Sequence, residues 1–108
     1  MVGERVHWAD DEAGYIRSRS QRYPGAIDVE PDWTQEALDD PELIAFEPDP
    51  KSRVGASRFI GESPTARLLI VVVGYRDLDG HLHGVNAWPA TGADRDAYEG
   101  GDEDGEHD

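Results

Sequence analysis

The chain has 108 residues, a formal net charge of −14 and no cysteine. Its length is that of one domain with a modest core, and its 37% hydrophobic content, with three Trp and four Tyr, is typical of a globular protein and not of a disordered one. The lack of cysteine excludes disulfides and thiolate metal sites, and no signal peptide or membrane-spanning run is visible, so a cytoplasmic protein is expected. A uniformly acidic surface would repel nucleic acid and anionic lipid.

The charge is unevenly distributed along the chain. Nine acidic residues lie between Ile27 and Pro50, and six more follow Tyr98. The basic residues lie elsewhere, and nine of the ten are arginine, which suits bidentate contacts with phosphate or carboxylate. These arginines could form a local basic face, or they could be paired with neighbouring acids, and both interpretations stay open.

The N-terminal half predicts a short strand at 6–8 followed by two helices. The first helix is expected over Ala9–Tyr23, with acids in its first turn, arginines in its last turn, and Pro24-Gly25 after its end. Asp32 to Gln35 has the form of a capping box, and Pro41 ends the second, shorter helix. Four residues of the first helix share one face at helical spacing and are its expected core face: Ala13, Ile16, Ser20 and Tyr23.

Four strands are expected next, and the last two form a hairpin. The hairpin turn is Asp79-Gly80, because glycine tolerates the positive φ that a tight turn requires. The expected strands are Leu43–Phe46, Arg53–Gly61, Leu68–Val73 and His81–Trp88. Alternation gives the third strand two apolar faces, with Leu68, Ile70 and Val72 on one and Leu69, Val71, Val73 and Tyr75 on the other. It is therefore expected in the interior of the sheet.

This element order predicts an α+β domain over residues 1–99. The expected architecture is a small antiparallel sheet with two N-terminal helices and one C-terminal helix, packed on one face. The last helix begins at another capping-box pattern, Thr91–Asp94, and runs to about Glu99. Residues 100–108 are acidic and contain no apolar side chain to bury, so a disordered tail is expected.

The C-terminal half resembles a known family. Leu82–Tyr98 resembles the closing segment of BrnT-type toxins, in which a strand ending in Ser-Ala-Arg is followed by Ala-Thr, an acidic–Arg pair and Tyr. Upstream segments that resemble the family's earlier elements are Trp8–Asp10, Trp33–Ala37, Asp40-Pro41, Arg58–Gly61 and Arg67–Val72. The resemblance covers Trp8 to Tyr98 in order and depends mainly on the order of the elements.

The resemblance implies the toxin half of a type II toxin–antitoxin pair. Such a protein has a RelE-like α+β fold, cleaves RNA without a metal or other cofactor, and is neutralised by a DNA-binding antitoxin. This chain departs from the family pattern, because Asn86-Ala87-Trp88 replaces Ser-Ala-Arg and the Lys-His pair that ends the first helix is missing. The alternative is therefore a catalytically eroded protein-binding module of the same fold, with no nuclease activity.

Metal-free RNA cleavage needs a base, an acid and cations for the phosphorane charge. Arg58, which matches an arginine of the family, is the candidate for phosphate binding in catalysis, and pairing with Glu62 or Asp49 is its structural alternative. His81 and His83 are two residues apart, so both project from one face of a strand. They could be an acid–base pair or two metal ligands. No third ligand is apparent nearby, and no metal site is predicted.

Five further arginines are candidates for substrate binding. Those at the end of the first helix could hold a phosphate backbone while Tyr15 or Tyr23 stacks on a base, or they could simply favour the C-terminal helix dipole. The substrate-binding candidates are Arg17, Arg19, Arg22, Arg53 and Arg95. His7 has no partner that the sequence identifies.

Overall fold

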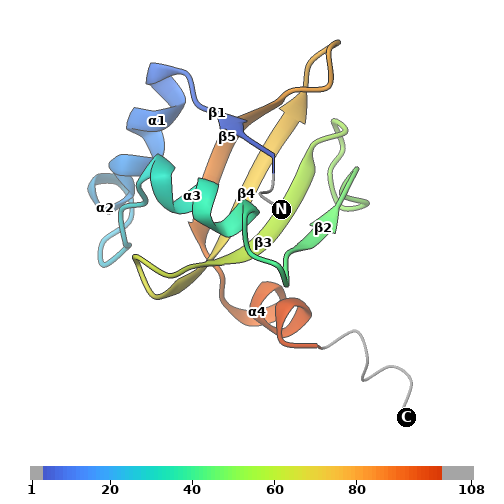
Figure 1. Ribbon diagram of the computed structural model, residues 1–108. Helices are drawn as coiled ribbons and strands as arrows, with labels where there is room; N and C mark the ends of the chain where they lie inside the picture. Colours follow the sequence, from blue (N-terminus) through green and yellow to red (C-terminus); the bar gives the residue numbers. More distant parts are fainter. Residues whose placement is uncertain (1–3, 101–108) are drawn as a thin grey trace.

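The structure, a computed structural model, describes residues 4–100 (Figure 1). Strands β4 (Leu68–Arg76) and β5 (Leu82–Pro89) form an antiparallel hairpin within a five-stranded sheet of order β1-β5-β4-β3-β2. The other strands are β1 (Val6–His7), β2 (Ile44–Phe46) and β3 (Ser57–Ser63). The helices are α1 (Asp10–Arg17), α2 (Arg19–Arg22), α3 (Pro31–Leu38) and α4 (Gly92–Tyr98).

The predicted turn between β4 and β5 is confirmed. Gly80 has a φ of +86°, in the region that glycine adopts without strain. The backbone of Asp77 closes the turn with two hydrogen bonds. Its amide donates to the carbonyl of His81 at 2.9 Å, and its carbonyl accepts from the amide of Gly80 at 2.9 Å. Its Oδ1 also accepts the amides of Asp79 and His81, both at 2.9 Å.

The sheet is mixed, so the prediction of an antiparallel sheet is wrong for its first strand. β1 runs parallel to β5, with Val6 opposite Leu82 and His7 opposite His83. Gln35 of α3 fixes β1 in this place, since its Oε1 accepts the amide of Val6 at 2.9 Å and its Nε2 donates to the carbonyl of Glu4 at 2.8 Å. A strand of two residues has too little alternation to reveal its partner or its direction.

The first predicted helix is interrupted, which gives three N-terminal helices in place of two. The chain leaves helical geometry at Ser18, which has φ −119° and ψ 27°. Its hydroxyl donates to the carbonyl of Gly14 at 2.8 Å and so competes with the backbone ladder. Ala13 and Ile16 are buried as expected, whereas Tyr23, beyond the break, is 52% exposed.

Neither predicted capping box forms. The cap residues of α3 and α4 are Glu30 and Thr91, and neither makes a side-chain hydrogen bond to its helix. The expected partners have other contacts: Gln35 binds β1, and Asp94 binds Arg58. In both cases a tertiary contact outcompetes the local motif.

Helices cover both faces of the sheet, which corrects the prediction that they pack on one face. Ile70 and Val72 of β4 belong to an apolar layer with Ile16 of α1 and with Ala37 and Leu38 of α3. The opposite face of β4, with Val71 and Val73, packs in a second layer with Ile60 of β3 and with Ala97 and Tyr98 of α4. The predicted division of this strand into two apolar faces is confirmed. Figure 1 shows α4 below the sheet, apart from the other helices.

None of the helices within residues 4–100 has the length and apolar content needed to cross a bilayer. The expected acidic tail lies outside the described residues, apart from Gly100.

Candidate functional site

The candidate site lies on the face of the sheet that carries α4, here called the α4 face. The pairing of Arg58 with Val73, and of Val73 with Asn86, places these three side chains on that face. Tyr75 follows two residues after Val73 and pairs with His83, so both join the same face. The face therefore holds two of the three residues that the sequence suggests for catalysis.

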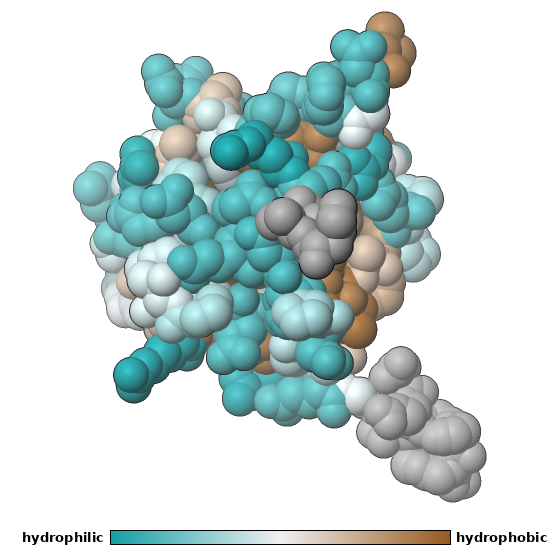
Figure 2. Space-filling model, in the orientation of Figure 1, coloured by the Kyte–Doolittle hydropathy of each residue, from teal (hydrophilic) through white to brown (hydrophobic). Residues whose placement is uncertain are grey.

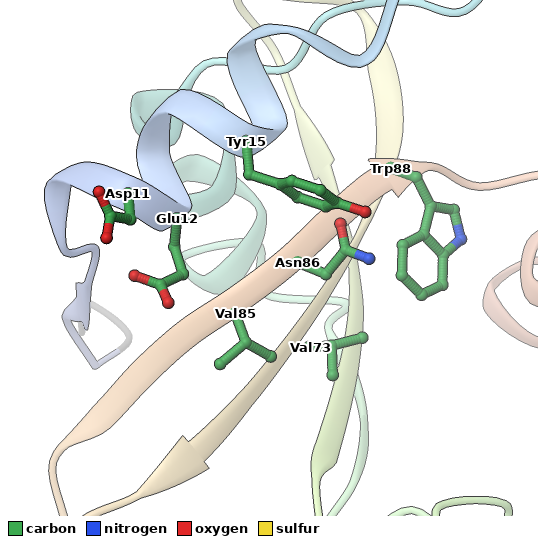
Figure 3. A pocket seen from close by; sticks show the side chains of 7 residues that line it. All are labelled: Asp11, Glu12, Tyr15, Val73, Val85, Asn86 and Trp88. Atoms are coloured by element: carbon green, nitrogen blue, oxygen red, sulfur yellow. The ribbon is translucent and has the colours of Figure 1, made fainter. Parts of the chain in front are cut away.

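A pocket of about 580 Å³ opens between α1 and β5. Its lining consists of two acids, two aromatic residues, two valines and one amide: Asp11, Glu12, Tyr15, Trp88, Val73, Val85 and Asn86. In Figure 3 the ring of Tyr15 extends from α1 across β5, with its hydroxyl toward Asn86 and Trp88. The two valines come from the sheet, and the two carboxylates come from the first turn of α1.

An irregularity in the β4–β5 ladder helps to form this pocket. Val73 pairs with Asn86 and Gly74 pairs with Gly84, so Val85 is left without a partner residue. An extra residue of this kind is a β-bulge, which redirects side chains locally. Both Val85 and Asn86 line the pocket as a result.

The aromatic rings of this region already accept internal cations. The guanidinium of Arg22 lies 3.7 Å from the ring centre of Tyr15 and 5.7 Å from that of Tyr23. A neighbouring pocket of about 200 Å³ includes these three residues and shares Tyr15, Asn86 and Trp88 with the first. The two pockets together form a continuous aromatic surface, with carboxylates at one end and arginines at the other.

Arg58 is held inside the protein by two carboxylates. Its Nε donates to Oδ2 of Asp49 at 2.8 Å, its Nη1 forms an ion pair with Asp94, and its guanidinium lies 4.3 Å from the ring centre of Phe46. The side chain is only 11% exposed. The hydrogen bond from Arg58 outweighs burial and holds the pKa of Asp49 below its usual range. Two of the three guanidinium nitrogens of Arg58, Nε and Nη1, are therefore held by carboxylates.

The structure joins His81 and His83 to Asp77 and His7, and we call these four residues the hairpin-tip cluster. Oδ2 of Asp77 lies 2.8 Å from Nε2 of His83 and 3.7 Å from Nδ1 of His81. The ring of His7 lies 5.4 Å from that of His83 and 5.8 Å from that of His81, measured between centres. The hydrogen bond with His83 is the main cause that lowers the pKa of Asp77 to about 2.

Most of the predicted substrate-binding arginines have partners close to them in the chain. Four of them are engaged locally: Arg17 pairs with Glu30 at 3.0 Å, Arg19 donates to the carbonyl of Ile27 at 3.0 Å, Arg22 stacks on Tyr15, and Arg95 pairs with Glu99 at 3.1 Å. Arg53 is exposed in the loop before β3. Only the contacts of Arg17 and Arg95 are the pairing with acids that the sequence also allowed.

Sequence reasoning missed His7 and Asp77 as members of the histidine cluster, and it missed the pocket. The parallel pairing of β1 brings His7 to His83, and that pairing has no signal in two residues. For Asp77 a signal existed, because an acid just before an Asp-Gly turn commonly accepts turn amides. The pocket depends on Tyr15 and Trp88, which are far apart in the chain and meet only in the fold.

Comparison of the chain with protein-family models, and with curated protein sequences, finds no match.

Proposed function

We propose that this protein is a protein-binding module with a RelE-like fold, whose pocket takes up a cationic side chain of a partner protein. The observation that carries the proposal is the combination of two carboxylates with aromatic walls around an apolar floor. A guanidinium or ammonium group is attracted by carboxylates and by the face of a Trp ring, whereas Arg22 already occupies one face of Tyr15. Its alkyl stem would pack on Val73 and Val85.

The charge of the chain supports a basic partner. A formal net charge of −14 steers basic proteins toward this surface and disfavours RNA. The resemblance to BrnT-type toxins implies a DNA-binding antitoxin as partner. A DNA-binding protein contacts phosphates with Lys and Arg, so it carries the side chains that this pocket suits.

The RelE-like assignment is supported by the element order. N-terminal helices precede the antiparallel run β2 to β5, and a single helix follows the last strand. Loss of nuclease activity within this fold is supported by the residues at the site. Trp88 stands where the family has an arginine, and the family-matching Arg58 is occupied by Asp49 and Asp94.

The test is a binding titration with a short fluorescein-labelled peptide of alternating arginine and serine, followed by fluorescence anisotropy. The double variant Asp11→Asn/Glu12→Gln should weaken binding about tenfold, the size expected for one or two charge contacts in a partly desolvated pocket. Tyr15→Ala should weaken it by a similar factor. The wild-type affinity should fall with added salt.

A matched control separates the pocket from the overall charge. The variant Glu42→Gln/Asp96→Asn removes two exposed acids outside the pocket, and both double variants have a formal charge of −12 in place of −14. The control should change the affinity less than twofold. Equal weakening by the two double variants would mean that the peptide responds to net charge alone, and the pocket proposal would be wrong.

A second candidate function is the metal-free endoribonuclease that the family resemblance implies. One observation favours it: Arg58 and His83 share the α4 face, and Asp77 orients His83 by a hydrogen bond. The test is incubation of the purified protein with RNA in the presence of EDTA. Cleavage that disappears in His83→Gln and in Arg58→Lys would favour this candidate, and intact RNA would favour the binding module.

A further inference from the structure

The hairpin-tip cluster brings three imidazoles and one carboxylate together from distant parts of the chain. His7 lies on β1, Asp77 and His81 flank the β4–β5 turn, and His83 lies on β5. The side chains of Asp77, His81 and His83 are 38%, 62% and 49% exposed, so solvent ions can reach them. Asp79 adds a second carboxylate, since its ligand atom, that of Asp77 and that of His81 lie within 4.8 Å of one another.

The cluster is preorganised by backbone contacts. Oδ1 of Asp77 accepts two turn amides, which leaves Oδ2 directed at the imidazoles of His81 and His83. The pairing of His7 with His83 in the parallel ladder holds those two rings beside each other. The groups therefore approach one another as a consequence of the fold. Among the described residues only Asp77, Asp79 and His81 already have ligand atoms within 4.8 Å of one another, so His83 and His7 must turn toward the ion on binding.

The contacts of Asp77 with the two histidines have a spacing close to that of a tetrahedral zinc site. With Zn–N bonds of about 2.0–2.1 Å, a tetrahedral ion holds neighbouring ligand atoms about 3.3 Å apart and the centres of two imidazole rings about 5 Å apart. The distances from Oδ2 of Asp77 to the two histidine nitrogens are 2.8 and 3.7 Å. The distances from the ring centre of His7 to those of His83 and His81 are 5.4 and 5.8 Å.

We propose that the hairpin-tip cluster binds a divalent transition-metal ion of the zinc class through Asp77, His81 and His83, with His7 as the fourth ligand. Imidazole nitrogen with one carboxylate suits Zn²⁺ or Ni²⁺ far better than Mg²⁺, which prefers oxygen. The bound ion links β1 to the β4–β5 hairpin, and the stability of the fold rises with the logarithm of the Zn²⁺ concentration once that concentration exceeds the dissociation constant. This site shares no residue with the pocket between α1 and β5, and the metal proposal does not depend on the proposed function.

The test is isothermal titration of Zn²⁺ into the full chain prepared without a histidine tag. We expect saturable binding of one ion per chain, weakened at least tenfold in both His7→Ala and His83→Ala. The fourth histidine of the chain, His107, supplies the matched control, because it is not one of the proposed ligands. His107→Ala should leave the affinity unchanged, and Mg²⁺ should give no comparable binding.

Ring ¹⁵N–¹H spectra of the wild-type protein provide a second measurement that needs no variant. Zn²⁺ should shift the ring signals of three histidines, and the thermal midpoint should rise with Zn²⁺ in the wild type and not in His83→Ala. The proposal is overturned if Zn²⁺ does not bind, if binding is lost in His107→Ala and kept in His83→Ala, or if Mg²⁺ binds equally well. The last result would indicate adsorption to the general negative charge.

Discussion

Two parts of the α4 face carry charged and aromatic side chains, but they use them differently. Arg58 lies between Asp49, Asp94 and the ring of Phe46, so two of its three guanidinium nitrogens are bound inside the protein. In the pocket, Asp11 and Glu12 form no ion pair with any other residue of the 4–100 segment.

The difference teaches that residue type alone does not identify a binding site. An arginine on a strand suits phosphate, yet here it stabilises the junction between β2, β3 and α4. Carboxylates in the first turn of a helix favour its dipole, yet here two of them border an aromatic pocket. What distinguishes the two sites is whether the protein itself supplies the counter-charge.

The largest effect is expected when Arg58 is removed. Arg58→Met leaves Asp49 and Asp94 close together without their cation, and loss of one member of a buried charge cluster costs about 3 kcal/mol of unfolding free energy. Urea unfolding measures this. The control Arg95→Met breaks an exposed pair with Glu99 and should cost less than about 0.5 kcal/mol. If the two variants are equally mild, Arg58 is not a structural residue and is available to phosphate.

An intermediate effect is expected at Tyr98, where α4 meets the chain after α3. Its hydroxyl donates to Oδ2 of Asp40 at 2.6 Å, and Tyr98→Phe should cost about 1 kcal/mol at neutral pH. Burial, with the hydrogen bond to Asp40, raises the pKa of Tyr98 above its usual value. A raised pKa means that this contribution is complete below the unfolded pKa of about 10 and declines as the pH rises above it.

Unfolding measured at neutral pH and above pH ~10 checks the Tyr98 prediction, with pH 10 being the ordinary tyrosine pKa. The difference between wild type and Tyr98→Phe should shrink at the higher pH. A difference that stays constant across this range would contradict the assigned hydrogen bond.

The smallest effect is expected at Asp77. In Asp77→Asn the amide oxygen can still accept the turn amides, so the turn should persist. The lowered pKa of Asp77, about 2 in the folded protein, means that its contribution is present above the unfolded pKa of about 4 and is lost as the pH falls toward 2. Thermal midpoints between these pH values should therefore fall more steeply in the wild type. Parallel acid profiles would show that the His83 contact is not formed in solution.

The sequence predicted those parts of the fold that depend on local patterns. The two faces of β4 follow from alternation, the turn follows from Asp79-Gly80, and Asp49 is a partner of Arg58 that its proximity in the chain already suggested. The parts of the fold that depend on contacts between residues distant in the chain had no such signal. The direction of β1 and the diversion of Gln35 and Asp94 from capping are set by contacts between residues distant in the chain.

The candidate site was less predictable than the fold for the same reason. A motif search favours Arg58 and the His81–His83 pair, whose residue types suit RNA chemistry. The pocket combines a helix and two strands, and its bulged residue Val85 has no distinctive type. The hairpin-tip cluster depends on the parallel pairing of β1 with β5, because only that pairing brings His7 beside His83. Both sites are therefore properties of the tertiary structure.

The most direct test of pocket binding is a ¹H–¹⁵N correlation spectrum recorded while the arginine–serine peptide, and separately a short RNA, is added to the wild-type protein. The peptide should shift the indole signal of Trp88 and the amide signals of Val85 and Asn86, and it should leave the Nε–H signal of Arg58 in place. RNA should shift none of them. Shifts of Arg58 and His83 with RNA, and none of Trp88 with the peptide, would contradict the binding-module proposal and favour the nuclease.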